Sequence, residues 1–518
     1  MSLARDVTTV GSATLLSRLF GFFRDMSIAA LLGAGPPSDA FFAVLQITNF
    51  FRRLLAEGAL NAAFVPIWLR IKQDEGASAG HRFFNEVFSA TTLTVGALAL
   101  TGLVLASPVI DMLAPGFGGQ RHALASDYLH TAAPYVALAG MVAVGAAVLN
   151  GEGRVVAVAL GVVSFNAVLL LVLAWIAVSG TRDPSAIGAV LAHGIVLAGL
   201  AQLVVTAIGF FRLRPLPMRL RLGLSADTRR FFALAIPGLV AAGIPQLKLI
   251  AGAMIASSSQ AAVSWLYYAN RLYELPLGVV SIAIAAVLVP RIAASVRAET
   301  RDGSAAAQSR GFEITMGLAL PSAVAFAVLA EPIARGLFER GAFGPRDTAA
   351  VAAALAAICA GLPGHTLEKL FGAISFAHED TRTPMLAALA GLAAAAAGSF
   401  ALFPDYGHVG VAAAIAVSGW VGATILGVIL WRRGWVVLDR AAARRLPRIV
   451  AATLAMGLVI FAARKLMASL PLDESSQLIR LAILTALVML GLGAYLAAIE
   501  ALGVVRMREL VAAVRERL

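Results

Sequence analysis

The sequence is poor in charge, has a single cysteine and contains no long polar stretch. Only 14% of its 518 residues are charged, whereas 60% are hydrophobic, and the mean hydropathy is +0.85. The lack of a long polar stretch leaves no room for a separate soluble domain. Apolar runs of about 20 residues, long enough to cross a bilayer core of ~30 Å, recur along the whole chain. The sequence therefore predicts an integral membrane protein almost throughout.

Several chemical signatures are also missing. Cys359 lies in an apolar run and is expected to be a packed, inert thiol. The 7 histidines show no metal-ligand spacing, and no GxxxxGK[ST] motif for binding nucleotide phosphates occurs. A membrane enzyme acting on polyprenyl diphosphates would need carboxylates on a metal, or a nucleophile with acid–base partners. We therefore expect no catalytic residue, cofactor or metal, and keep such an enzyme only as a less favoured alternative.

The hydrophobic runs predict helices rather than barrel strands. Strands of a membrane barrel are alternating segments of about 10 residues, whereas these runs are continuous and rich in Ala, Leu, Val and Gly. The predicted fold is an all-α integral membrane protein with fourteen transmembrane helices. The predicted spans are 7–33, 39–69, 83–112, 127–150, 155–179, 186–211, 230–257, 263–290, 311–331, 347–376, 383–403, 409–431, 448–466 and 478–504.

The net charge of +12 could suggest a nucleic-acid partner, but the loops explain most of it. If both termini are cytoplasmic, 26 of the 41 Lys and Arg residues lie in cytoplasmic loops and ends, and 8 lie on the other side. This asymmetry follows the positive-inside rule. It predicts a multi-pass protein of the cytoplasmic membrane with both termini inside, and no nucleic-acid partner.

The remaining 7 basic residues lie in the interior of the predicted spans, away from the residues at the span ends, which are counted with the loops. A charged side chain at a helix centre costs about 2.5–3.5 kcal/mol on insertion scales, so these residues cannot all face lipid. Arginine predominates, and its forked guanidinium suits phosphate oxygens. We therefore predict a water-filled cavity that binds an anion. The seven residues are Arg18, Arg24, Arg52, Arg53, Lys248, Arg271 and Lys369, and the main acidic residues in the spans are Asp25, Asp39, Glu57, Glu274 and Glu368.

Internal ion pairs are the alternative to a cavity. Arg53 and Glu57 are four residues apart, and Arg271 and Glu274 are three apart, so both pairs could be salt bridges within one helix. We leave that alternative open for both arginines. Arg24 is not expected to pair with the adjacent Asp25, because neighbouring helical residues point about 100° apart. The alternative fails for the whole set, since cations outnumber anions in the interior of the spans.

An internal repeat places some of these cations. A shift of 224 residues aligns 41–67 with 265–291, Pro66 with Pro290, and Arg24 with Lys248, and a shift of 228 aligns NGEGR at 150–154 with HEDTR at 378–382. We predict two six-helix lobes related by a pseudo-two-fold axis along the membrane normal, with the cations facing a central cleft. The predicted lobes are 1–225 and 226–440. Residues 441–518 hold the two extra helices, which could be packing or a groove for a lipid tail.

Three stretches of the sequence resemble those of a known family. SRLFGFFRDMSIAALLGAGPPSDAFFAVLQITNFFRRLLAEGALNAAFVPIW near the N-terminus is similar to the MviN/MurJ family of lipid II flippases in the MOP superfamily, and YANRLYELPLGVVSIAIAAVLVPRI and DTRTP resemble its later motifs. The resemblance implies export of undecaprenyl-pyrophosphate-linked peptidoglycan precursor across a bacterial inner membrane. That role serves cell-wall biogenesis and cell shape, and the implied partners are lipid II, membrane lipids and peptidoglycan-synthesis proteins. We expect a monomer.

The resemblance also assigns site residues. Arg18, Arg24, Arg52 and Arg271 correspond to the family's cavity arginines, while Lys248 and Arg53 are expected to assist. Their supporting polar and acidic companions are Asp25, Asp39, Asn49, Glu57 and Glu274. A sodium site found in some relatives is not expected, because 230–257 and 383–403 contain no carboxylate. An exporter of other polysaccharide-linked lipids remains an alternative.

Overall fold

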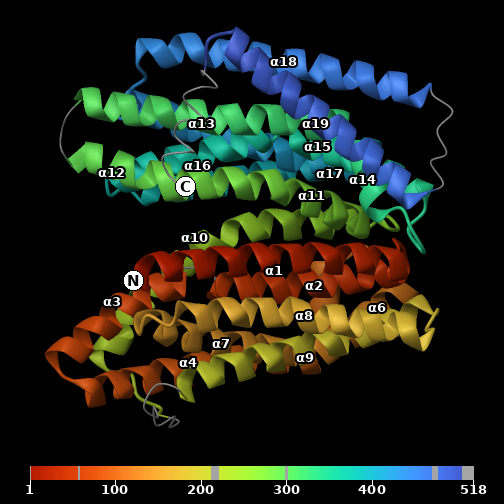
Figure 1. The fold of residues 1–518 in the computed structure, drawn as a ribbon. Helices are drawn as coiled ribbons and strands as arrows, with labels where there is room; N and C mark the ends of the chain where they lie inside the picture. Colours follow the sequence, from red (N-terminus) through yellow and green to blue (C-terminus); the bar gives the residue numbers. More distant parts are fainter. Residues whose placement is uncertain (1, 57–58, 212–220, 298–300, 470–475, 505–518) are drawn as a thin grey trace. The chain divides into compact units, whose positions relative to one another are not determined.

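The computed structural model describes residues 2–56, 59–211, 221–297, 301–469 and 476–504. Every regular element among these residues is a helix, and no strand occurs among them (Figure 1). The prediction of an all-α membrane protein is confirmed. Contacts divide the chain into two units: unit 1 is Met1–Ser264 with Arg340–Phe343, and unit 2 is Trp265–Glu339 with Gly344–Leu518.

In unit 1, α7 packs against α2, α3, α4, α8 and α9. Two glycines of α7 allow this close packing. A Cβ atom at Gly140 would lie 2.5 Å from Val95 on α4, and one at Gly145 would lie 2.8 Å from Thr206 on α9. The helices are α1 (Ser2–Leu32), α2 (Pro36–Ala56), α3 (Ala59–Asp74), α4 (Ala77–Val104), α5 (Ala106–Leu113), α6 (Gln120–Ala132), α7 (Pro134–Gly151), α8 (Val155–Ser179), α9 (Pro184–Phe211) and α10 (Ala226–Ala256).

An aromatic cluster holds the start of α10 against α3 and α4. The rings of Phe64 and Phe83 stack with centroids 5.1 Å apart, and Phe231 of α10 meets Phe64 edge-on at 6.0 Å. All three side chains are buried. The contacts therefore group α10 with unit 1, whereas the sequence repeat assigns residues from 226 onward to the second lobe. The lobe boundaries stay a prediction.

In unit 2, the last two helices pack on the rest of the unit. α18 contacts α13 and α19, and α19 also contacts α14 (Figure 1). α11 begins in unit 1 at Ala262 and continues in unit 2. The helices are α11 (Ala262–Ala283), the π-helical η1 (Ile284–Leu288), α12 (Val289–Arg297), α13 (Arg301–Val328), α14 (Ala330–Phe338), α15 (Pro345–Cys359), α16 (Leu362–Ala377), α17 (Arg382–Arg432), α18 (Arg440–Ala468) and α19 (Gln477–Ala501).

The count of fourteen spans is not confirmed. Ten helices of the described residues are long and apolar enough to cross a membrane, or eleven if the pair α15 and α16, bent by 41°, is one span. Two predicted spans, 383–403 and 409–431, merge in α17 across a kink at Gly407, whose φ is 54°. α1 and α11 are not among these ten helices, and both contain charged residues that lower their apolar content.

The two turns that the repeat aligned each present a carboxylate to basic partners. Glu152 follows α7 and accepts hydrogen bonds from Lys72 Nζ (2.6 Å) and Trp68 Nε1 (2.9 Å). Asp380 precedes α17 and accepts from the backbone N–H groups of Arg382 and Thr383, both at 3.0 Å. Burial raises the pKa of Asp380, but the hydrogen bonds from Thr383 and Arg433 outweigh it and leave the pKa at about 2.

Candidate functional site

Arg24 is the most enclosed cation of the predicted site. It lies on α1 with 6% of its surface exposed. Its Nη2 and Nε atoms donate to Asp25 Oδ1 at 2.7 and 2.9 Å, and its Nη1 donates to Asn166 Oδ1 at 3.0 Å. Asn166 comes from α8 and donates in turn to the backbone oxygen of Ser17 at 3.2 Å. These contacts fix the guanidinium inside the helix bundle of unit 1.

The prediction that Arg24 and Asp25 do not pair is wrong. The two positions do point in different directions around α1, but the arginine side chain is long enough to bend back to the adjacent carboxylate. Asn166 was not predicted at all. It is a lone amide in the apolar run 155–179, which is the signal that could have drawn attention to it.

Arg52 and Asn49 lie three residues apart on α2 and contact each other. Arg52 Nε donates to Asn49 Oδ1 at 3.4 Å, and the Arg52 side chain is half-buried. The buried Tyr135 of α7 lies within electrostatic range of both Arg52 and Arg24. Two of the predicted cavity arginines thus lie close enough to the same side chain of unit 1, Tyr135, to act on it electrostatically.

The other predicted cations of unit 1 differ in exposure. Arg18 is exposed on α1, Arg53 is half-buried on α2, and Lys248 is buried on α10 with 6% exposed. The predicted partner of Arg53, Glu57, lies outside the described residues. The ion pair between Arg53 and Glu57 therefore stays a prediction.

In unit 2, Arg271 and Glu274 form the predicted ion pair along α11. Their Nη1 and Oε2 atoms are 3.4 Å apart, and about a fifth of each side chain is exposed (21% and 23%). Ser281, also on α11, accepts a hydrogen bond at its Oγ atom from Lys369 Nζ of α16 at 2.7 Å. Pairing within the helix therefore holds for Arg271, and it leaves the guanidinium partly open to a ligand.

Asp39 caps the start of α11. It is fully buried on α2, and its Oδ1 accepts from Ser264 N (3.0 Å) and Ser264 Oγ (2.7 Å) while its Oδ2 accepts from Ala261 N (2.7 Å). A carboxylate at a helix N-terminus is stabilised by the free N–H groups and by the helix dipole. Ala261 has a φ of 66°, a region that residues other than glycine rarely adopt. The cap holds the turn between α10 and α11 against α2.

Arg121 strengthens the same contact. Its Nη1 lies 3.6 Å from Asp39 Oδ2 and donates to the backbone oxygens of Ser257 (2.9 Å) and Ser259 (3.1 Å). The backbone N–H of Gly116 donates to Ser257 Oγ at 2.8 Å. The sequence reasoning counted Arg121 only as a loop charge, because these partners are about 80 or more residues away in the chain. We call Asp39, Arg121, Ser257 and Ser264 the α11 latch.

Among the described residues, no group of three or more His, Cys, Asp or Glu side chains could hold a metal ion. The groups that the structure does bring together are guanidinium and ammonium donors with amide and carboxylate partners. Such donors suit a multiply charged anion such as a phosphate ester.

The fold matches solved transporter structures. Over 97% of this chain and 99% of the other, it superposes with a TM-score of 0.80 and 21% identity on "Lipid II flippase MurJ, inward closed conformation". An inward-facing multidrug resistance MATE family transporter of the MOP superfamily gives a TM-score of 0.65 at 16% identity, over 80% of this chain and 94% of that one. These likenesses show the fold, and with its long apolar helices it is the fold of a multi-pass membrane protein.

Sequence comparisons narrow the class to one family. A family model described as lipid II flippase MurJ matches residues 28–476. A probable lipid II flippase MurJ of Rhizobium meliloti (strain 1021) is 40% identical over 477 residues, which cover 89% of this chain and 87% of the relative. The lipid II flippase MurJ of Burkholderia cenocepacia is 31% identical over 84% of this chain and 85% of its own. The chain belongs to the lipid II flippase MurJ family.

Proposed function

We propose that this chain carries lipid II, the undecaprenyl-pyrophosphate-linked peptidoglycan precursor, from the inner to the outer leaflet of the cytoplasmic membrane. Membership of the MurJ family supports the substrate, since its relatives are named lipid II flippases. The proposal makes the chain a transporter rather than an enzyme. We further propose that it acts as a monomer, with both termini cytoplasmic.

The observation that carries the proposal is the burial of Arg24 within unit 1. A permanently charged guanidinium inside an apolar helix bundle is costly to retain, and intramembrane charges usually mark a substrate pathway. We assign Arg24, Arg52 and Arg271 to the pyrophosphate, with Arg18, Arg53 and Lys248 adding positive potential. Asp25, Asn49 and Glu274 orient these groups.

The bound substrate shifts the equilibrium between two states of the molecule, and transport follows from this shift. Without an anion, the like charges of Arg24, Arg52, Lys248 and Arg271 repel one another in the proposed cavity. The pyrophosphate offsets this repulsion and favours closure around the headgroup, because a ligand stabilises the state that it binds better. Opening to the other side then requires the α11 latch to break. Residues 441–518 are proposed to lie beside the lipid tail.

The test is depletion of the protein in its native host, followed by measurement of lipid II in each leaflet. A flippase predicts that intact lipid II accumulates in the inner leaflet. An enzyme acting on polyprenyl diphosphates would instead change the chemical composition of the lipid-linked pool. An exporter of another polysaccharide-linked lipid would leave the distribution of lipid II unchanged.

A further inference from the structure

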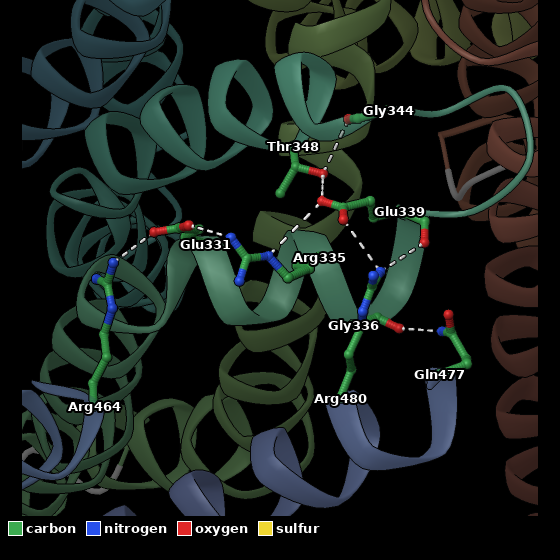
Figure 2. A network of polar contacts seen from close by, with 9 residues as sticks. All are labelled: Glu331, Arg335, Gly336, Glu339, Gly344, Thr348, Arg464, Gln477 and Arg480. Carbon is green, nitrogen blue, oxygen red and sulfur yellow. Dashed lines mark hydrogen bonds and ion pairs between the residues drawn. The ribbon is translucent and has the colours of Figure 1, made fainter. Parts of the chain in front are cut away.

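A chain of alternating charges links three helices of unit 2 at the end where α13 and α18 stop and α19 begins (Figure 2). Arg464 Nη2 of α18 donates to Glu331 Oε2 at 2.7 Å, and Glu331 Oε1 accepts from Arg335 Nη2 at 2.8 Å. Arg335 Nε lies 3.8 Å from Glu339 Oε2, and Arg480 Nη1 of α19 donates to Glu339 Oε1 at 3.2 Å. This series of charges begins with Arg464 and ends with Arg480.

Further bonds fix these arginines in place. Arg464 Nη1 donates to the backbone oxygen of Val328 at 2.9 Å, and Arg480 Nη1 donates to that of Glu339 at 3.3 Å. Thr348 Oγ1 donates to Glu339 Oε2 at 2.6 Å, and Gln477 Nε2 donates to the backbone oxygen of Gly336 at 2.7 Å (Figure 2). The guanidinium groups are therefore positioned before any ligand arrives.

These side chains surround a pocket of about 130 Å³. One water needs roughly 10–15 Å³ of such space, so the pocket has room for a phosphate-sized group. Three arginines line it against one carboxylate, and its other lining side chains are mainly apolar. The lining residues are Glu331, Pro332, Arg335, Gly336, Arg464, Met467, Arg480, Ile483 and Leu487.

The charge and the surroundings of the pocket favour a lipid. With Glu339 included, this network of charges contains three guanidinium groups and two carboxylates. Each guanidinium has five N–H donors, which is more than the two carboxylates can use. The helix surface around the pocket is apolar and exposed, at Leu466 of α18 and Leu478 of α19. A ligand here would meet cations at its headgroup and apolar helix surface at its tail. Basic pockets between membrane helices bind anionic lipid headgroups in this way.

We propose that this pocket binds the phosphate of an anionic phospholipid of the surrounding bilayer, with Arg335, Arg464 and Arg480 as its ligands and Met467, Ile483 and Leu487 against an acyl chain. The occupant is a resident phospholipid rather than the transported substrate, so the site is independent of the proposed function. Binding there ties α14, α18 and α19 together through one headgroup.

The test uses the purified full-length protein in detergent, with phosphatidylglycerol and phosphatidylcholine of matched acyl chains offered as probes and retained lipid measured by native mass spectrometry. The wild-type protein is expected to retain phosphatidylglycerol in preference. The double variant Arg464→Gln/Arg480→Gln should bind it about 25-fold more weakly, roughly fivefold for each arginine. Arg464→Lys/Arg480→Lys keeps the charge and should restore most of the binding.

The matched control is Arg382→Gln/Arg432→Gln, which removes the same charge from two exposed positions at the other end of unit 2. It should leave the preference for phosphatidylglycerol unchanged. Equal retention of the two lipids by the wild-type protein would overturn the proposal. So would retention by the Gln variant at the wild-type level, or displacement of phosphatidylglycerol by millimolar inorganic phosphate, which would indicate a site for the free anion. The Lys variant keeps the positive charge, so binding by this variant would show that the Gln variant lost binding through loss of charge and not through loss of fold.

Discussion

At the scale of single residues, Arg24 has a structural role as the partner of Asp25 and a proposed role in transport, and the two can be separated. Arg24→Ala removes the cation that buried Asp25 faces at 2.7 Å. Removing one partner of a buried ion pair costs about 3–5 kcal/mol. We expect Arg24→Ala to lower the thermal stability of the detergent-solubilised protein and to abolish lipid II transport.

The double variant Arg24→Ala/Asp25→Ala distinguishes the two roles. Because it removes the buried carboxylate together with its cation, it should recover much of the lost stability. It should still fail to transport, since the guanidinium proposed to bind pyrophosphate is gone. Recovery of both stability and transport would show that Arg24 serves only to neutralise Asp25.

Asp39 should control how readily the start of α11 detaches. Loss of a helix-capping side chain costs about 0.5–2 kcal/mol. In a protein whose single cysteine is replaced (Cys359→Ala), a reporter Ala262→Cys lies at a buried position. We expect Asp39→Ala to raise its labelling rate by an impermeant maleimide roughly tenfold. Asp39→Asn keeps an oxygen acceptor and should have a smaller effect; no change with Asp39→Ala would mean that the latch does not limit access.

Some residues of the candidate site could be predicted from the sequence, and their partners could not. The charge balance in the spans singled out Arg24, Asp25 and Asp39, because ionisable residues are rare in apolar runs. Their partners, Asn166 and Arg121, lie about 80 or more residues away in the chain, so only the folded helices reveal them.

At the scale of helices, boundaries were predicted best where the chain changes abruptly from apolar to polar. The predicted span 155–179 coincides with α8. Breaks set by tertiary contacts were missed. The span 347–376 divides at Gly361, where a Cβ atom would lie 2.4 Å from Ala416 Cα of α17. The local sign of this break, Gly361 followed by Pro363, is present in the sequence, but the apolar run continues through it.

The start of α17 should depend on pH through Asp380. Its pKa in the folded protein, about 2, is below the ordinary 3.8, so its contribution to stability is present above pH 3.8 and lost as the pH falls through 2. The melting temperature of the wild-type protein should exceed that of Asp380→Asn at neutral pH. The difference should shrink towards pH 2, and a difference independent of pH would contradict the assignment.

At the scale of the whole molecule, the predicted topology requires α17 to cross the membrane twice. Single cysteines in the Cys359→Ala background can test this in intact spheroplasts. An impermeant maleimide added outside should label Asp405→Cys, beside the kink in α17, and Gly118→Cys. It should not label Glu379→Cys until the membrane is permeabilised. The reverse pattern, or external labelling of all three, would contradict fourteen spans with cytoplasmic termini.

The central claim is that a few arginines within the membrane helices carry the substrate. The most direct measurement is the amount of lipid II in the outer leaflet of depleted cells that express Arg24→Ala, Arg52→Ala or Arg271→Ala at equal membrane levels, with Arg432→Ala as the matched control. The control should restore the wild-type amount, and each of the three variants should leave lipid II in the inner leaflet. Full transport by all three variants would contradict the account.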